Sequence, residues 1–150
     1  MEQAAQGFGP MMKLMMMGMG GLSKAFYNKY GEEALPIITE GARQGGVEYG
    51  KLMKQMAPTQ DMKAFAESMK MMDSMMGLGM EVVELSDKVF HFKVSRCPLG
   101  IEGTSKKLCE ALMTNDKEMM STFLGKEVEM KIPKSVAVGD KECEVIYTIK

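Results

Sequence analysis

Three cysteines are the residues of this chain whose type and setting most favour chemistry. Cys97 ends a predicted strand, Cys109 lies on a predicted helix, and Cys143 begins another predicted strand. Because a strand end, a helix and a strand start can meet at one edge of a sheet, we expect the three thiols to converge. Thiolates bind zinc and iron–sulfur centres well. The sequence therefore predicts a shared metal or ligand site at these cysteines, with Cys97 as the candidate nucleophile.

The cysteine spacing leaves a plainer interpretation open. Eleven residues separate Cys97 from Cys109 and thirty-three separate Cys109 from Cys143, which matches no standard zinc-finger pattern. Free cysteine is often a small buried apolar residue. Cys109 and Cys143 could therefore be ordinary core residues.

Charged residues beside the cysteines are candidate helpers. Arg96 could lower the pKa of the Cys97 thiol or bind a substrate carboxylate. Asp116 is a candidate catalytic acid or base, and Asp140 a candidate ligand-binding residue. Both have structural alternatives, since Asp116 suits the first turn of a helix and Asp140 suits a turn after glycine.

His91 is the only histidine. It precedes Cys97 by six residues, which is roughly 20 Å along an extended strand. The two side chains therefore cannot share a metal unless the strand folds back, and a surface or half-buried strand histidine is the favoured interpretation.

Composition excludes several classes of partner. The 150 residues include 19 basic and 20 acidic ones, and the net charge of −1 gives no field for nucleic acid or an anionic membrane. The apolar stretch at residues 11–22 is too short to span a bilayer. With an odd number of cysteines and no recognisable secretory signal, we expect a cytoplasmic protein without disulfides, whose thiols are free, catalytic or metal-bound.

Methionine is the compositional outlier, with twenty copies. Most follow helical stripes, where methionine fills irregular apolar gaps. The stretch at residues 11–17 also leaves open a copper site or an apolar surface for a partner.

The N-terminal half predicts helices. Residues 1–22 indicate a mobile arm or a loosely packed helix, and a short helix should run from Ser23 to Gly31. A long helix over 32–56 should face the core or a partner, with Gly45-Gly46 where another backbone comes close. Its stripe is Leu35, Ile38, Ala42, Gly45, Tyr49, Leu52 and Met56.

The rest of the chain predicts one more methionine-striped helix and then mixed structure. That helix begins with Thr59 as N-cap and ends at Gly77. Strands follow at 80–85 and 89–94. Two helices come next, one capped by Thr104 or Ser105 and one from Asn115 to Gly125. A third strand then begins at Val128, and a last strand runs from Cys143 to Ile149. We therefore expect residues 23–150 to form one α+β domain, a four-stranded antiparallel sheet covered by N-terminal and inserted helices.

Several phrases of the sequence resemble a known family. They are Tyr30-Gly31-Glu32-Glu33-Ala34, Arg96-Cys97-Pro98, Leu108-Cys109 with Asn115-Asp116, and Val136 to Asp140 leading to Cys143. Residues 24–148 resemble the L-2-amino-thiazoline-4-carboxylic acid hydrolase-like family, which is related to the vinyl-reductase-type hydrocarbon-binding domain. Met113 stands where members of the family often carry a further cysteine.

The resemblance implies an α+β ligand-binding fold, often dimeric through its helices, with a pocket between helices and sheet and cysteines at one end. Some members open a 2-aminothiazoline ring, and others bind small apolar molecules. We therefore expect a small-molecule-binding module, with a hydrolase using Cys97 or a cysteine-bound metal as the alternative. Docking through the long helix, as a homodimer, is a further expectation.

Overall fold

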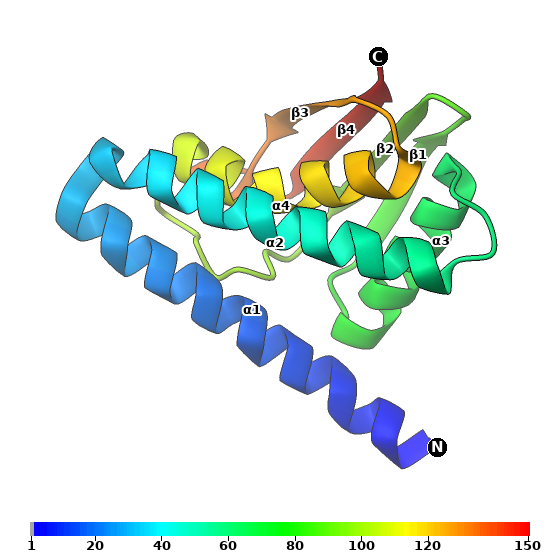
Figure 1. Cartoon of the computed structure of the whole chain (residues 1–150). Helices are drawn as coiled ribbons and strands as arrows, with labels where there is room; N and C mark the ends of the chain where they lie inside the picture. Colours follow the sequence, from blue (N-terminus) through cyan, green and yellow to red (C-terminus); the bar gives the residue numbers. More distant parts are fainter. Residues whose placement is uncertain (1) are drawn as a thin grey trace.

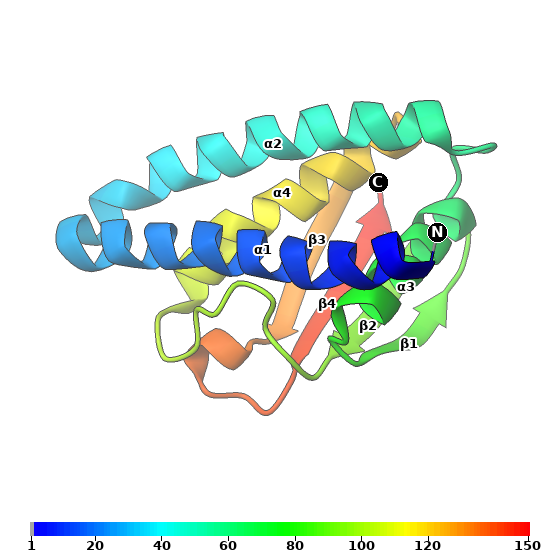
Figure 2. The same cartoon turned by 90° about the horizontal axis from the view of Figure 1, so that it is seen from below.

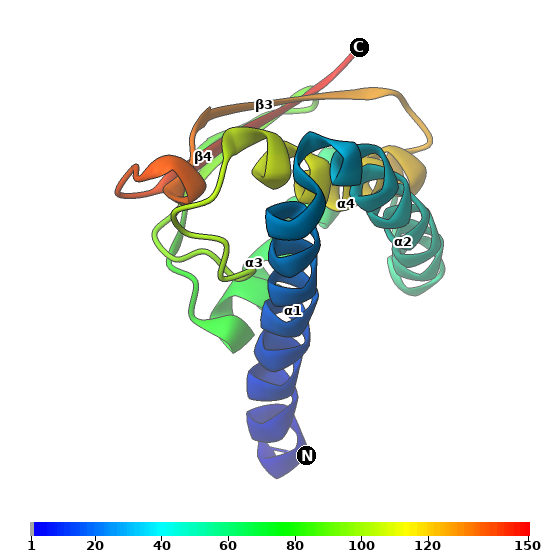
Figure 3. The same cartoon turned by 90° about the vertical axis from the view of Figure 1, so that its left-hand side faces the viewer.

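Helices cover one face of a single sheet in this protein. The computed structural model describes the backbone of residues 2–150 and side chains from residue 7 onward; Met1, the first residue of the predicted arm, lies outside the described residues. Figures 1 and 3 show the helices on one side of the sheet. The helices are α1 (Glu2–Tyr30), α2 (Leu35–Met56), α3 (Met62–Met76) and α4 (Lys106–Leu124). The strands are β1 (Met80–Leu85), β2 (Val89–Val94), β3 (Val128–Lys134) and β4 (Cys143–Ile149). The predicted α+β fold class is confirmed.

The sheet is antiparallel, in the order β1-β2-β4-β3. Phe90, Phe92 and Tyr147 alternate toward the helices and are buried. The opposite face carries polar residues such as His91, Lys93 and Glu144 beside the apolar Val89 and Ile146, which is typical of an antiparallel sheet covered on one side. Pro133 lies in the edge strand β3, where the register shifts between Lys131 and Lys134, so the predicted edge position is confirmed.

Helix α2 packs backbone to backbone on α4. A Cβ atom added to Gly46 would lie 2.2 Å from the Asn115 carbonyl oxygen, so the predicted close approach is confirmed. The buried face runs through Ile38, Gly46, Gly50 and Met53. The predicted stripe is therefore off by about one residue in its second half, where Tyr49, Leu52 and Met56 are exposed. The close contact selects the face that carries glycines over the more apolar face beside it.

Helix α4 is continuous, so the prediction of two helices is wrong. Its N-cap is Ser105, whose side chain accepts a hydrogen bond from the Leu108 amide, and it ends at Gly125 in the left-handed conformation. Asn115 lies inside the helix and donates its side-chain amide to the Ala42 carbonyl oxygen of α2 at 3.2 Å. A residue that looked like a helix start is instead a link between helices.

Helix α1 is also continuous, from Glu2 to Tyr30, so a helix start at Ser23 is wrong, whereas the predicted end at Gly31 is confirmed by its φ of 63°. Figure 2 shows α1 lying across α3 and the loop before α4. Two glycines make this approach possible, because a Cβ on Gly9 or Gly20 would collide with the carbonyl oxygens of Met75 and Leu99. The division between arm and domain at residue 22 stays a prediction.

Helix α3 carries the predicted methionine stripe toward the core, but it begins later than expected. Asp61, not Thr59, is the N-cap, and its carboxylate accepts a hydrogen bond from the Ala64 amide at 2.8 Å. Within residues 2–150, no helix is long and apolar enough to cross a bilayer. The cytoplasmic location stays a prediction.

Candidate functional site

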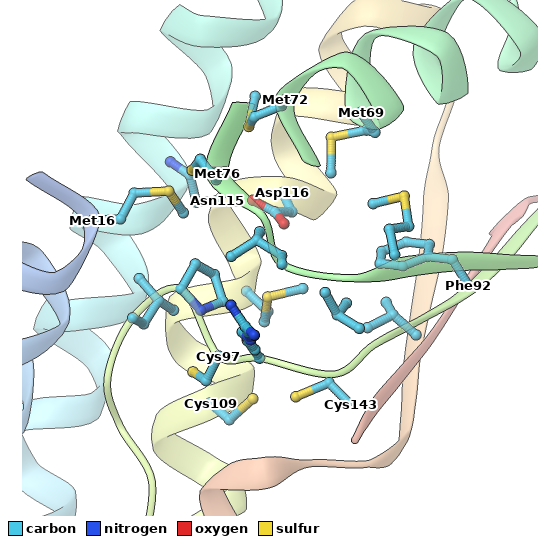
Figure 4. Close-up of a pocket in the computed structure, with 18 of the residues that line it drawn as sticks. Met16, Met69, Met72, Met76, Phe92, Cys97, Cys109, Asn115, Asp116 and Cys143 are labelled. Atoms are coloured by element: carbon cyan, nitrogen blue, oxygen red, sulfur yellow. The ribbon is translucent and has the colours of Figure 1, made fainter. Parts of the chain in front are cut away.

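A cavity of about 230 Å³ lies between the helices and the inner face of the sheet. Figure 4 shows side chains from α1, α3, α4 and the sheet directed into it. Its wall is apolar and unusually rich in sulfur, with three cysteines and nine methionines. The methionines are Met12, Met16, Met19, Met69, Met72, Met76, Met80, Met113 and Met119.

All three cysteines line this cavity, and Figure 4 shows them at one end of it. Cys97 lies in the loop after β2, Cys109 in the first turns of α4, and Cys143 at the first position of β4. Each thiol is free. The antiparallel pairing of β2 with β4 explains part of this arrangement, because it sets Cys143 opposite Val94 near the end of β2.

The environment favours the protonated form of two of these thiols. Burial raises the pKa of Cys109 to about 11 and also raises the pKa of Cys143. Two contacts work against the burial effect. The Ser135 hydroxyl interacts with both thiols, and the Val136 amide donates to the Cys143 sulfur at 3.4 Å. At neutral pH both groups are thiols and therefore poor nucleophiles.

The described residues hold no group of three or more cysteine, histidine or acidic side chains arranged to bind a metal ion. The predicted zinc or iron–sulfur site at Cys97, Cys109 and Cys143 thus gains no support from the geometry and stays a prediction.

Asp116 lines the cavity apart from the cysteines, and Figure 4 shows it near Met76 of α3. It follows Cys109 by seven residues on α4, which places both on one side of the helix, roughly 10.5 Å apart along its axis. Figure 4 shows its carboxylate directed into the cavity. Among residues 2–150, no side chain or backbone group forms a hydrogen bond or ion pair with this carboxylate. Burial raises its pKa to about 6.

Two tyrosines lie near Asp116. Burial raises the pKa of Tyr49 on α2 and that of Tyr147 on β4, and the Asp116 charge adds to both shifts. The Tyr147 hydroxyl is buried and has no hydrogen-bond partner within the described part of the chain. The Asp116 charge therefore acts on a buried phenol, Tyr147, and on a partly exposed one, Tyr49.

The other candidate residues have different positions. Arg96 lines the cavity, and its guanidinium donates to the Gly77 carbonyl oxygen at 3.4 Å. Asp140 does not line the cavity. Its exposed carboxylate accepts a hydrogen bond from the Ser135 amide at 2.8 Å and stabilises the turn before β4. The structure thus gives Asp140 the turn role that was the alternative interpretation of this residue.

His91 lies on the far side of the sheet from the cysteines. It is half-buried on β2, and its Nε2 atom lies 2.7 Å from Glu144 Oε1 on β4. This hydrogen bond lowers the pKa of Glu144. The interpretation of His91 as a half-buried strand residue is confirmed, and it cannot serve Cys97 as a base.

Sequence reasoning missed part of the site. Ser135, which contacts two of the thiols, was not singled out, although it stands four residues before the Gly139 turn and caps a short helical turn at Val136–Val138. The methionine stripe of α3 was assigned to the core, whereas three of its members form cavity wall. No pattern in the sequence separates a methionine that fills a core from one that lines a space.

Comparison with known proteins agrees with this architecture. The model of the L-2-amino-thiazoline-4-carboxylic acid hydrolase family matches residues 11–147. The chain belongs to this family. The resemblance read from the cysteine phrases is therefore confirmed. No curated protein matches the sequence at a significant level.

Two solved structures share the fold of this family member. One is the phenol-responsive sensory domain of the transcription activator PoxR with phenol, at 16% identity and a TM-score of 0.61, covering 89% of this chain and 74% of that chain. The other is a trafficking protein particle complex subunit 3 from Naegleria fowleri covalently bound to palmitic acid, at 19% identity and a TM-score of 0.63, covering 93% and 95%.

Proposed function

We propose that this protein is a small-molecule-binding module whose cavity takes an apolar ligand the size of one ring. The observation that carries the proposal is the sulfur-rich cavity of about 230 Å³. An apolar protein cavity of about 150 Å³ binds benzene, so simple scaling gives this cavity room for roughly nine non-hydrogen atoms. Thioether sulfur also makes favourable contacts with aromatic rings, and methionine adapts its shape to a ligand.

The two structural relatives bind ligands of different size, and the cavity favours one of them. Phenol, which the PoxR domain holds, is within the size limit. Palmitic acid, which is attached to the trafficking subunit, has about twice as many heavy atoms as this cavity accommodates. A phenol-sized molecule is therefore the better model for the ligand of this protein.

A pair of tryptophan substitutions tests the proposal. Met72 lines the cavity from α3, whereas its neighbour Met71 is exposed outside it. We expect toluene and phenol to raise the melting temperature of the wild-type protein and of Met71→Trp. Met72→Trp fills the cavity and should show no such shift. A wild-type protein that neither compound stabilises would contradict the proposal.

Ring-opening hydrolysis is the second candidate, and membership of the hydrolase family favours it. Cys97 would add to the amidine carbon of a 2-aminothiazoline, and the bond from that carbon to the ring sulfur would break, with Asp116 as the acid that protonates the leaving sulfur. Water would then displace the Cys97 thiol from the carbon and complete the hydrolysis. Against it, Figure 4 shows Asp116 apart from Cys97 and nearer to Met76, and the wall offers few polar partners to such a polar substrate. The test is release of thiol from L-2-amino-thiazoline-4-carboxylic acid, which Cys97→Ala should abolish if Cys97 is the nucleophile.

The outer face of α1 supports a homodimer. This face, opposite the cavity, carries large apolar side chains that are exposed, with Leu14 at 70% and Leu22 at 75% exposure. An extended apolar surface of this kind marks an interaction site. We infer that a second copy of the chain covers it, and light scattering at micromolar concentration measures the mass of the resulting species.

A further inference from the structure

Among the residues whose side chains are described, Asp116 is the one acidic residue lining the cavity, and none of them forms an ion pair with its carboxylate. From α1 and α3, methionines face it; from α2, Tyr49; and from β4, Tyr147. Cys109 lies two turns away on the same helix. Arg96, the one cation that lines the cavity in the described part of the chain, donates a hydrogen bond to the Gly77 carbonyl oxygen and makes no ion pair with Asp116.

Asp116 is half-buried. An ionised carboxylate beside apolar walls is costly, because the group loses part of its water and gains no partner. Replacing the Asp116 side chain by a neutral one would remove this free-energy cost from the folded protein. The Asp116 carboxylate therefore lacks an ion-pair partner, and a ligand with a positive group of the right size would provide one.

We propose that the cavity selects a ring-sized apolar molecule that carries one protonated amine or amidine group, and that Asp116 pairs with this group. This inference rests on the proposed binding function and adds the head group that the ligand must have. The ring then lies along α4 toward Cys109, in the roughly 10.5 Å between the two side chains. The cation of the ligand then supplies the partner that the Asp116 carboxylate lacks.

Three compounds of similar size separate the contribution of the charged group from that of the apolar ring. Benzylamine carries a cation, ethylbenzene replaces the amine by a methyl group, and benzoate carries an anion. Their affinities are measured by isothermal titration calorimetry for the wild-type protein, Asp116→Asn and Glu110→Gln. Glu110 is an exposed acid on the same helix outside the cavity, so its variant is the matched control.

We expect the wild-type protein and Glu110→Gln to bind benzylamine roughly tenfold or more tighter than ethylbenzene, as a charge-assisted hydrogen bond provides. Benzoate should bind weakest. Asp116→Asn should lose the preference for benzylamine and keep its affinity for ethylbenzene, which also shows that the variant is folded. In the wild-type protein, benzylamine affinity should fall as pH decreases through 6, where Asp116 takes up a proton.

The two proposals fail in different ways. If ethylbenzene binds the wild-type protein as tightly as benzylamine, or if Asp116→Asn keeps the preference for the amine, the head-group inference is wrong while the binding function stands. Tightest binding of benzoate would equally overturn it and would point to Arg96. If none of the three compounds binds, the proposed function itself fails and the inference fails with it.

Discussion

At the scale of single residues, Asp116 makes the protein less stable than it could be. Its pKa is about 6 in the folded protein, against 3.8 for an ordinary aspartate. Below about pH 4 both the folded and the unfolded chain hold the proton, and the residue costs nothing. As pH rises from 4 to 6 the unfolded chain loses its proton first, so stability falls, and above pH 6 the loss is constant.

Asp116→Asn should therefore stabilise the protein at pH 8 by up to about 3 kcal/mol, since each unit of pKa shift corresponds to about 1.4 kcal/mol. The gain should disappear below pH 4. Urea unfolding at both pH values measures it. A gain of equal size at both would mean that the stabilisation has a cause other than ionisation.

The candidate site was predicted from the sequence only in part. Cys109 and Cys143 were correctly placed on a helix and at a strand start, whereas Cys97, predicted at a strand end, lies in the loop after β2. Asp116 was assigned to a helix start, because Asn115 followed by Glu118 imitates a capping box. The seven-residue spacing from Cys109, a repeat of one helical face, was the signal for its true position. The empty space it faces has no signature in the sequence.

The thiols give a second test at this scale. Because burial raises the pKa of Cys109 to about 11, this thiol should react with iodoacetamide very slowly at pH 7.5 in the folded protein. Peptide mapping by mass spectrometry measures the rate, with urea-unfolded protein as the control. Rapid labelling of folded Cys109 would show that the thiol is more acidic and more accessible than its environment implies.

At the scale of elements, glycine decides which faces of α1 and α2 meet their neighbours. Apolar periodicity predicted α2, α3 and the strands, but it put Tyr49 and Leu52 on the buried face of α2. The contact with α4 depends instead on the absence of a side chain at Gly46 and Gly50. In α1, five glycines and Pro10 weaken the intrinsic helix preference, and packing against α3 and the Leu99 loop overrides it.

A pair of alanine substitutions in α2 isolates this effect. Gly41 is exposed and has open space at its Cβ position, so Gly41→Ala should stabilise the protein by about 1 kcal/mol through helix preference. Gly46→Ala gains the same preference but collides with the Asn115 carbonyl, and should destabilise by about 1–3 kcal/mol overall. Chemical unfolding compares them. Stabilisation by both substitutions would argue against the close packing of α2 on α4.

The corresponding pair in α1 tests whether this helix closes the cavity. A Cβ on Gly20 would collide with the Leu99 carbonyl, whereas Gly18 has open space. Gly20→Ala should detach α1 and expose Met12 and Met16, which line the cavity. We expect faster hydrogen exchange in α1 and weaker toluene binding for Gly20→Ala, and neither change for Gly18→Ala. Equal behaviour of the two variants would mean that α1 does not depend on this contact.

At the scale of the whole molecule, the apolar residues of α1 lie on two sides of the helix, one facing the cavity and one facing solvent. The inner side closes the cavity, and the outer side is exposed in the single chain. Figures 1 and 2 both show α1 and α2 joined at one end and diverging along their length, which leaves the outer side of α1 accessible to a second molecule.

Charge on the outer side should therefore disrupt association. Leu14→Glu and Leu22→Glu lie on this side, and each should shift the protein from dimer toward monomer in sedimentation velocity experiments. Val138→Glu introduces the same charge at an exposed valine on the short turn before β4, and should leave the mass unchanged. A wild-type protein that is monomeric at high micromolar concentration would refute the dimer.

The distribution of methionine also makes the molecule easy to observe. Nine methionine methyl groups surround the cavity, while others, such as Met11 and Met15, lie on the outer side of α1. Carbon-13 labelling at these methyl groups alone would give separate sets of magnetic-resonance signals for the two surfaces. One sample could then distinguish the entry of a small molecule from the arrival of a second chain, because each event would perturb a different set.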